Sequence, residues 1–257
     1  MGITSYWDKL RSIFSLSLSL AKANFKLRNE GSYLGIFWYL LEPLLMFLVI
    51  LIVTNNMGVV NEDYPIYLLI GLILFNFFIG ATTLASNVII LNSNFIKSMN
   101  ISKEAIVFSK IVQSVFSHFF EILILFVFMV FFKSNLVGII YYPIIFLFIF
   151  LFITGFSFIL ATMGAYMADI KNVWNVLSKL IWFVTPIFYF VEPGSRLYKI
   201  NLFNPMFYYI EACRSILIYN KIPSLLIIIG VIVSALAFFI LGIIVFQKYK
   251  DKIAEVI

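Results

Sequence analysis

Residues 138–166, GIIYYPIIFLFIFLFITGFSFILATMGAY, form an apolar run without a charged side chain. A helix needs about 20 such residues to cross the roughly 30 Å hydrocarbon core of a bilayer. The rest of the chain is similar, since 63% of all residues are hydrophobic and 12% are charged, with a mean hydropathy of +1.06. No polar stretch is long enough to fold as a soluble catalytic domain. The sequence therefore predicts an integral membrane protein.

Six stretches have the length and apolarity of a membrane span. They are Tyr33–Thr54, Tyr64–Leu91, Ala105–Phe132, Gly138–Tyr166, Val173–Val191 and Pro223–Phe246. A further apolar segment, 197–219, is interrupted by Asn204-Pro205 and carries Glu211 and Arg214. Irregular backbone at membrane depth requires protein or a cavity around it, so we interpret residues 196–220 as a re-entrant hairpin, with a seventh span as the alternative. The predicted fold class is an all-α membrane protein with six transmembrane helices.

The basic residues indicate the orientation of the chain. Thirteen of the 18 Lys and Arg residues lie in the N-terminal segment, the C-terminus, and the loops after the second and fourth spans with their flanks. Basic loops favour the cytoplasmic side, so six spans place both termini in the cytoplasm, whereas seven would place the basic C-terminus outside. The net charge of +6 then reflects topology and contact with anionic lipid, not nucleic acid. We expect a location in the cytoplasmic (inner) membrane.

The first 30 residues predict an amphipathic helix. Its apolar residues recur at steps of three or four, give or take one: Trp7, Leu10, Phe14, Leu18 and Phe25. Polar and basic residues fill the gaps, which is typical of a helix lying along a membrane surface. A soluble helix packed on a loop is the alternative. We therefore divide the chain into an interface helix, 1–30, and a transmembrane domain, 31–257.

The chain lacks recognisable catalytic machinery. It has no P-loop, no His-Glu-x-x-His and no Gly-x-Ser-x-Gly, so transport against a gradient would need an ion gradient or a separate ATPase. With one cysteine, Cys213, a multi-cysteine metal site is excluded, and we expect no metal ligands. His118 and Glu121 share a helical face. They are a candidate general-base pair or proton relay, but a satisfied polar pair between helices is favoured.

Two further features point to transport. Glu42, within the first span, should face a bundle interior, a cavity or a hydrogen-bond donor, because a charge in lipid is unfavourable. Aromatic residues occupy the first and fifth spans: Tyr33, Phe37, Trp38, Trp182, Phe188 and Tyr189. Such rings can stack on sugars and would line a path for a glycan; interface belts and packing are the alternative.

Five motifs, in order along the chain, resemble the membrane subunit of ABC-2 type polysaccharide exporters. They are SYLGIFWYLLEP at 32–43, ADI at 168–170, TPIFY at 185–189, Asn204-Pro205 with Arg214, and FQKYKDKIAEVI at 246–257. That family moves lipid-linked O-antigen, capsule or teichoic acid. The resemblance covers nearly the whole chain.

The resemblance implies a homodimer bound to two copies of a separate ABC ATPase, which uses ATP and Mg while this chain binds no cofactor. A coupling helix within about 92–102 would dock on the ATPase through Asn94, Phe95, Ile96, Lys97, Ser98 and Met99. The outer hairpin would form a gate with Glu192, Asn204 and Arg214. The channel would open between the first and fifth spans, where Tyr33, Phe37, Trp38, Trp182 and Tyr189 would contact the glycan. Lys26 and Arg28 are candidates for contact with the lipid pyrophosphate, or else plain lipid-facing charges.

One departure concerns the coupling segment. Ser102 and Val107 occupy places where relatives often carry proline, which affects the expected shape of the coupling helix; without the family, the segment is a docking surface or a mere connector. The function expected is ATP-driven export of a lipid-linked polysaccharide. The alternatives are export of a drug or other small amphiphile, and a membrane enzyme using His118 and Glu121.

Overall fold

A computed structural model describes residues 3–58, 62–99, 101–134 and 136–256, and all regular structure within these ranges is helical. The helices are α1 (Ile3–Asn29), η1 (Gly35–Phe37), α2 (Trp38–Asn56), α3 (Tyr64–Ser86), α4 (Val88–Leu91), α5 (Ser93–Met99), α6 (Lys103–Phe131), η2 (Leu136–Tyr141), α7 (Tyr142–Tyr166), α8 (Ile170–Val184), α9 (Arg196–Asn201), α10 (Pro205–Leu217) and α11 (Leu225–Val256). The predicted all-α class is confirmed.

Five helical segments in the described ranges are long and apolar enough to cross a membrane. They are Gly35–Asn56, Tyr64–Ser86, Lys103–Phe131, Leu136–Tyr166 and Leu225–Ile253. Each corresponds to a predicted span. The second is shorter than predicted, because the helix breaks at Asn87 before the short α4.

The fifth predicted span, Val173–Val191, differs from the expectation. Its helix, α8, has 15 residues and ends at Val184, which at 1.5 Å per residue gives about 22 Å. Pro186 follows, and proline disfavours a helical conformation in the residue before it. Residues 185–195 continue without regular structure, so only the first part of this segment is a helix.

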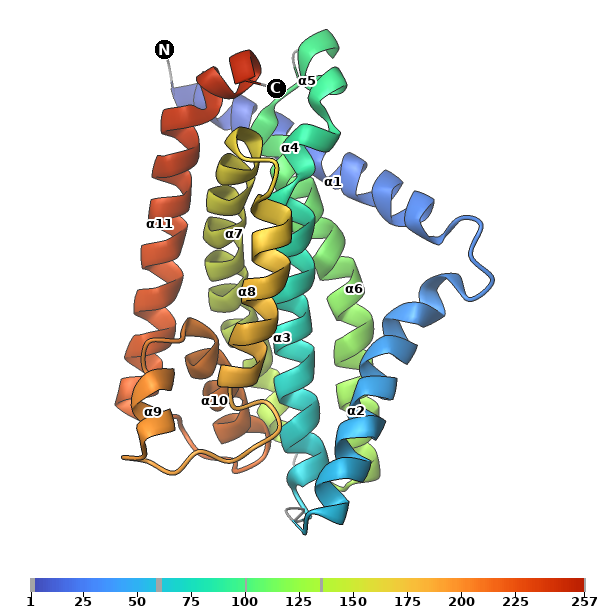
Figure 1. Ribbon diagram of the computed structural model, residues 1–257, viewed down its shortest axis with the longest axis vertical. Coiled ribbons are helices and arrows are strands. Elements are labelled where there is room, and N and C mark those ends of the chain that lie inside the picture. The colour runs from blue at the N-terminus through green and yellow to red at the C-terminus, as the bar shows by residue number, and fades with distance from the viewer. Residues whose placement is uncertain (1–2, 59–61, 100, 135, 257) are drawn as a thin grey trace.

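The chain begins and finishes at the same end of the bundle (Figure 1). The start of α1, the short helix α5, the α7–α8 connection and the end of α11 gather there, while α9 and α10 lie at the opposite end. The segments gathered with the termini are those that the charge count assigns to one side. With 6 and 13 residues, neither α9 nor α10 can cross a bilayer, which favours the hairpin over a seventh span.

Helix α3 forms the centre of the bundle. Leu68, Leu69, Ile70 and Leu72 are consecutive or nearly so, yet each is at most 1% exposed. A helix buried all round must have neighbours on every side. In Figure 1, α3 is flanked by α6, α7 and α8.

Helices α7 and α11 touch backbone to backbone. A Cβ atom added to Gly155 would lie 2.1 Å from the carbonyl oxygen of Phe238, and one added to Gly242 would lie 2.2 Å from that of Gly155. Small residues at helix contacts allow this close approach inside membranes. The pair is therefore packed too tightly for a larger side chain at either glycine.

Helix α1 forms within the predicted range and packs on the bundle through small residues. Ser17 and Ala21 are fully buried, whereas Trp7 and Phe14 are exposed; the side chain of Leu10 lies outside the described part. The small residues permit α1 to lie close against α6. Its larger apolar residues remain available for lipid.

An ion pair and a hydrogen bond join the end of α11 to the start of α6. Lys250 Nζ lies 3.0 Å from Glu104 Oε1, and Lys103 Nζ donates to the backbone carbonyl of Lys250. Ile253 is fully buried in a small apolar cluster that also contains Ile96 of α5. The last helix therefore holds the segment that carries α5.

Candidate functional site

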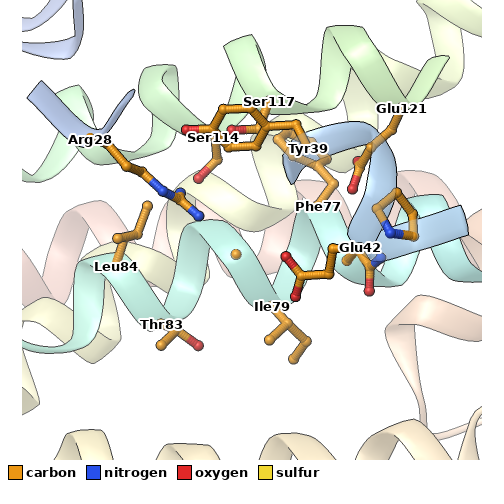
Figure 2. Close-up of a pocket in the computed structure, with 13 residues that line it drawn as sticks. Arg28, Tyr39, Glu42, Phe77, Ile79, Thr83, Leu84, Ser114, Ser117 and Glu121 are labelled. Atoms are coloured by element: carbon orange, nitrogen blue, oxygen red, sulfur yellow. The ribbon is translucent and has the colours of Figure 1, made fainter. Parts of the chain in front are cut away.

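A cavity of about 330 Å³, whose lining includes a group of polar side chains, lies between the end of α1 and helices α2, α3 and α6 (Figure 2). Its polar lining consists of Arg28, Tyr39, Glu42, Asn76, Thr83, Ser114, Ser117 and Glu121. In so apolar a chain, polar groups at membrane depth are unfavourable unless they serve structure or function. This concentration makes the cavity the leading candidate for a functional site.

Helical periodicity brings these groups together. Asn76 and Thr83 are seven residues apart on α3, and Ser114 and Glu121 are seven apart on α6. Two turns of helix return to the same face, so each helix presents a polar stripe to the cavity. The sequence shows this spacing, but only the structure shows that the two stripes face each other.

The turn between α1 and α2 places Arg28 at this cavity. Gly31 and Gly35 have φ values of 80° and 46°, which glycine adopts without steric cost. The chain reverses there, and the Arg28 guanidinium lies 4.9 Å from the centroid of the Tyr39 ring. Residues from both sides of the turn thus line one site.

A second cavity of about 220 Å³ adjoins the first. Both are lined by Arg28, Tyr39 and Glu42. The second adds Asn29, Ser32, Gly35 and Trp38. The two cavities are therefore neighbours, and together their lining extends from the α1–α2 turn into the bundle.

The two predicted lipid-head residues differ in their surroundings. Lys26 is exposed and pairs with Glu30 at 3.5 Å, and it lines neither cavity. Arg28 lines both cavities and forms no ion pair with any residue that the structure describes. Of the two residues, Arg28 is the one positioned to contact a ligand in the cavities.

His118 and Glu121 form a buried network with Tyr142. His118 Nδ1 lies 2.8 Å from Glu121 Oε2, and His118 Nε2 lies 2.6 Å from the Tyr142 hydroxyl. The imidazole stacks on Phe77, with ring centroids 4.3 Å apart. Both nitrogens are thus engaged, which fits the satisfied polar pair favoured by the sequence.

The predicted glycan-contacting aromatic residues form two separate groups in one chain. Tyr33, Phe37 and Trp38 are exposed near the α1–α2 turn, and Trp38 alone of these lines a cavity. Trp182 stacks on Phe188 at 5.2 Å. Among the described residues no ring contact joins one group to the other.

The predicted coupling segment contains a short exposed helix, α5. Phe95 is 57% exposed and Ile96 is 5% exposed; Asn94, Lys97 and Ser98 are exposed, while the side chain of Met99 and residue Asn100 lie outside the described part. Ser102 caps α6 by accepting a hydrogen bond from the Ala105 amide at 3.2 Å. Ser102 is therefore the N-cap of α6.

Arg214, the predicted gate residue, is fully buried and organises the irregular segment after α8. Its guanidinium donates to the carbonyls of Pro186 at 2.8 Å and Ile187 at 3.0 Å, and to Glu211 Oε1 at 3.0 Å. Buried backbone carbonyls require such partners. This explains how non-helical backbone is tolerated here.

Two tyrosines of α3 complete this arrangement. The hydroxyl of Tyr64 donates to the carbonyl of Phe188 at 2.7 Å, and that of Tyr67 donates to the carbonyl of Tyr189 at 2.8 Å. With Arg214, they satisfy the carbonyls of residues 186–189 one after another. We call Arg214, Tyr64 and Tyr67 the carbonyl clamp.

The other predicted gate residues lie at the edges of the clamp. Asn204 Nδ2 donates to Thr185 Oγ1 at 2.7 Å, and its Oδ1 accepts from the Met206 amide at the start of α10. Glu192 is exposed, in the irregular segment. Sequence reasoning missed Tyr64 and Tyr67, whose spacing on one face of α3 was the available signal.

No group of three or more His, Cys, Asp or Glu residues that could hold a metal ion occurs in the ranges that the structure describes. The chemistry offered by the cavity is therefore hydrogen bonding and charge. Arg28 can hold an anion, and Glu42 and Asn76 can accept from hydroxyl groups.

Comparison with known proteins shows the family to which this chain belongs. Residues 16–218 match the family model described as ABC-2 type transporter. The chain belongs to the ABC-2 type transporter family. It is 25% identical over 255 residues to the O-antigen export system permease protein RfbA of Klebsiella pneumoniae, covering 95% of this chain and 96% of that protein. A second Klebsiella pneumoniae protein of the same name is 23% identical over 254 residues, again covering 95% and 96%.

Membership confirms the resemblance found in the sequence motifs. As an ABC-2 type transporter, the chain is a multi-pass membrane protein with a role in transport. Members of this family are transport subunits, and membership implies an ABC ATPase as partner. The polar cavity and the carbonyl clamp are thus features of an ABC-2 permease.

Proposed function

We propose that this ABC-2 permease exports a lipid-linked, O-antigen-like polysaccharide across the cytoplasmic membrane. The observation that carries the proposal is the cavity beside α1 and α2. Its lining includes Arg28 of α1, the helix that the sequence predicts to lie along the membrane surface. A lipid-linked glycan has an anionic head between an apolar tail and a polar chain. Such a substrate needs a polar site reached from the membrane surface. Similarity along almost the full length to O-antigen export permeases supports the same substrate class.

Energy would come from the partner ATPase, which would bind ATP and Mg, while this chain binds no cofactor. We propose a homodimer with two ATPase copies, with both termini and α5 on the cytoplasmic side. The exposed Phe95 and the buried Ile96 of α5 suit a docking helix that is held by its own core. Movement of α5 would reach the end of α11 through the apolar cluster that contains Ile96 and Ile253, and from there α6 through the Lys250–Glu104 contact.

In a homodimer, two copies would bring the separate aromatic groups together. Tyr33, Phe37 and Trp38 of one chain would face Trp182 and Tyr189 of the other, with the hairpin of α9 and α10 at the outer end. Aromatic faces contact sugars without tight hydrogen bonding, so a long glycan could slide past them. The carbonyl clamp would hold the outer gate in position.

Deletion and complementation test the proposal. A strain lacking this chain should accumulate lipid-linked glycan on the cytoplasmic face, and the wild-type chain should restore surface glycan only with an active partner ATPase. The control is the same strain with an ATPase variant that binds but does not hydrolyse ATP. Normal surface glycan in the deletion strain, together with increased sensitivity to small amphiphiles, would instead identify a drug-type exporter.

A further inference from the structure

The side chain of Lys179, in α8, is charged, exposed and unpaired. Lys179 is the tenth residue of this helix, which has 15, and its side chain is exposed. With the residues that the structure describes it forms no ion pair. A lysine at membrane depth is unfavourable unless it faces water, a polar group or an opposite charge. No described residue of the same chain meets this requirement.

The depth of Lys179 follows from the contact of α8 with the central helix. Trp174 donates to Thr82 Oγ1 of α3 at 3.1 Å. Lys179 is five residues further on, about 7.5 Å along the helix axis. Because α3 and α8 run in opposite directions (Figure 1), the same step along α3 leads from Thr82 to Phe77. Lys179 therefore lies near the middle of α3, which spans Tyr64–Ser86.

Glu42 of α2 lies at the same depth and has the opposite charge. It shares the lining of the larger cavity with Asn76, Phe77 and Gly80 of α3. Its side chain is exposed, and within the described ranges it also forms no ion pair. Figure 2 shows its carboxylate extending from α2. One level of the bundle thus holds an unpaired carboxylate and an unpaired ammonium group.

Helices α2 and α8 border an open face of α3. Both pack on α3, and in Figure 1 they lie on either side of it. Gly80 of α3 is exposed, and a Cβ added there would meet nothing within 4 Å. Apolar side chains such as Ile52 of α2 and Leu180 of α8 are exposed as well. Lipid tails can cover those side chains but not the two charges, so the charges decide what covers this face.

A second copy of the chain supplies a partner for both charges. Most homo-oligomers have closed symmetry, and the contacts of a two-fold interface are reciprocal. A two-fold axis along the bilayer normal keeps every residue at its own depth, so residues at one level can meet. The rotation also brings α2 of one copy against α8 of the other. Phosphate groups of lipids, in contrast, lie at the membrane surface, outside the roughly 30 Å hydrocarbon core.

We propose that Glu42 of one copy forms an ion pair with Lys179 of the other, twice, across the interface of the homodimer. This proposal rests on the proposed function and adds the contact that aligns the two copies. Charged pairs across an interface fix its register, because a displaced partner leaves a charge without compensation. The pair therefore selects one vertical alignment of α2 against α8.

Exchange of the charges between two co-expressed copies tests the proposal. One copy carries Glu42→Lys and the other Lys179→Glu, each with its own affinity tag. Either variant alone places like charges together at both contacts, whereas a mixed dimer restores an opposite pair at both. Homodimers of each variant should dissociate about tenfold more readily than the wild type. Two-step affinity purification should recover mixed dimers severalfold above the random share, and export should return only when both copies are present.

The matched control is Lys171→Glu. Lys171 is exposed on the same helix, eight residues or about 12 Å nearer the cytoplasmic end. Because its depth differs from that of Glu42, a copy with Lys171→Glu should show no preference for a copy with Glu42→Lys. A preference as large as that of Lys179→Glu would show that any added carboxylate suffices, and it would overturn the proposal.

Cross-linking tests the same contact without relying on charge. In chains with Cys213→Ala, a short bismaleimide should join Glu42→Cys of one copy to Lys179→Cys of the other, while the second contact keeps its natural pair. Phe119→Cys takes the place of Lys179→Cys in the control. Phe119 is exposed on α6 and follows His118, which stacks on Phe77, so its depth is similar. Equal cross-linking of the two cysteine pairs, or none of the first, would overturn the proposal.

The outcomes separate this proposal from the proposed function. A wild-type chain that stays monomeric would overturn the homodimer of the proposed function together with the ion pair. A wild-type dimer without preference for mixed dimers would overturn the ion pair alone. Normal homodimers of Glu42→Lys and Lys179→Glu with reduced export would also overturn it, and would assign the two charges to the transport path.

Discussion

The guanidinium carbon of Arg214 lies 3.3 Å from the centroid of the Tyr67 ring, and the same guanidinium donates two hydrogen bonds to the Tyr67 carbonyl. Tyr67 in turn donates its hydroxyl to the carbonyl of Tyr189. One residue of α3 thus supports both the arginine and the segment that the arginine holds. Cation–π contact is strongest where water is excluded, as it is here. The non-helical segment after α8 is therefore held in place by the central helix α3.

Replacing Arg214 should destabilise the permease. Arg214→Gln leaves the carbonyls of Pro186 and Ile187 and the Glu211 carboxylate without a charged donor, and each unsatisfied buried acceptor costs about 1–3 kcal/mol. We expect the free energy of unfolding in detergent to fall by about 3 kcal/mol or more. Arg196→Gln, at an exposed position of α9, is the control. Equal unfolding of Arg214→Gln and wild type would contradict the clamp.

Removing the tyrosine hydroxyls should loosen the same segment locally. Tyr64→Phe and Tyr67→Phe keep the rings but release the carbonyls of Phe188 and Tyr189, at about 1 kcal/mol each. Hydrogen exchange of the amides of residues 187–190 should become faster in each variant, while amides in α7 stay protected. Unchanged exchange in the double variant would show that these hydroxyls do not hold the segment.

The glycine contact between α7 and α11 should tolerate no side chain. A Cβ at Gly155 would lie 2.1 Å from the Phe238 carbonyl oxygen, so Gly155→Ala should force the backbones apart and cost about 1–3 kcal/mol. Gly80→Ala is the matched control, because a Cβ there meets nothing within 4 Å. Thermal unfolding in detergent distinguishes the two, and similar curves would argue against the contact.

Substitutions of two adjacent residues in α5 should have different effects, one on binding of the partner ATPase and the other on stability. Phe95 is exposed and Ile96 is buried beside Ile253. Phe95→Ala should reduce co-purification of the partner ATPase at least severalfold without changing thermal stability. Ile96→Ala should instead lower the free energy of unfolding by about 2–5 kcal/mol. Full ATPase recovery with Phe95→Ala would rule out docking through this side.

The helices were largely predictable because apolar length is a strong signal. The span that contains Ile149 and Phe152 could be predicted from composition alone. The positions of the basic residues correctly predicted which segments lie together at one end of the bundle. The end of α8 was harder, because Thr185-Pro186 lies within a run that stays apolar to Val191. What permits the break is Arg214, 28 residues later, and such a partnership cannot be read from local pattern.

The candidate site was predictable only in part. Arg28 and Glu42 were recognisable as charges near or within a span, and His118 with Glu121 as one helical face. That Tyr39 would be buried without a partner, or that Asn76 would face Glu121 across a cavity, depends on how α2 and α6 pack on α3. Those facts arise from tertiary packing, which helical periodicity alone does not determine.

The glycine contact between α7 and α11 also divides the protein mechanically. Because the backbones of α7 and α11 touch, rotation of either helix would bring a side chain against a carbonyl of the other. The two helices should therefore move together as one rigid unit. Helix α2, in contrast, is mostly exposed along its length and meets the bundle on one side. The pair of α7 and α11 is therefore the more constrained part of the bundle, and α2, which is joined to α1 through the turn at Gly31 and Gly35, is the less constrained one.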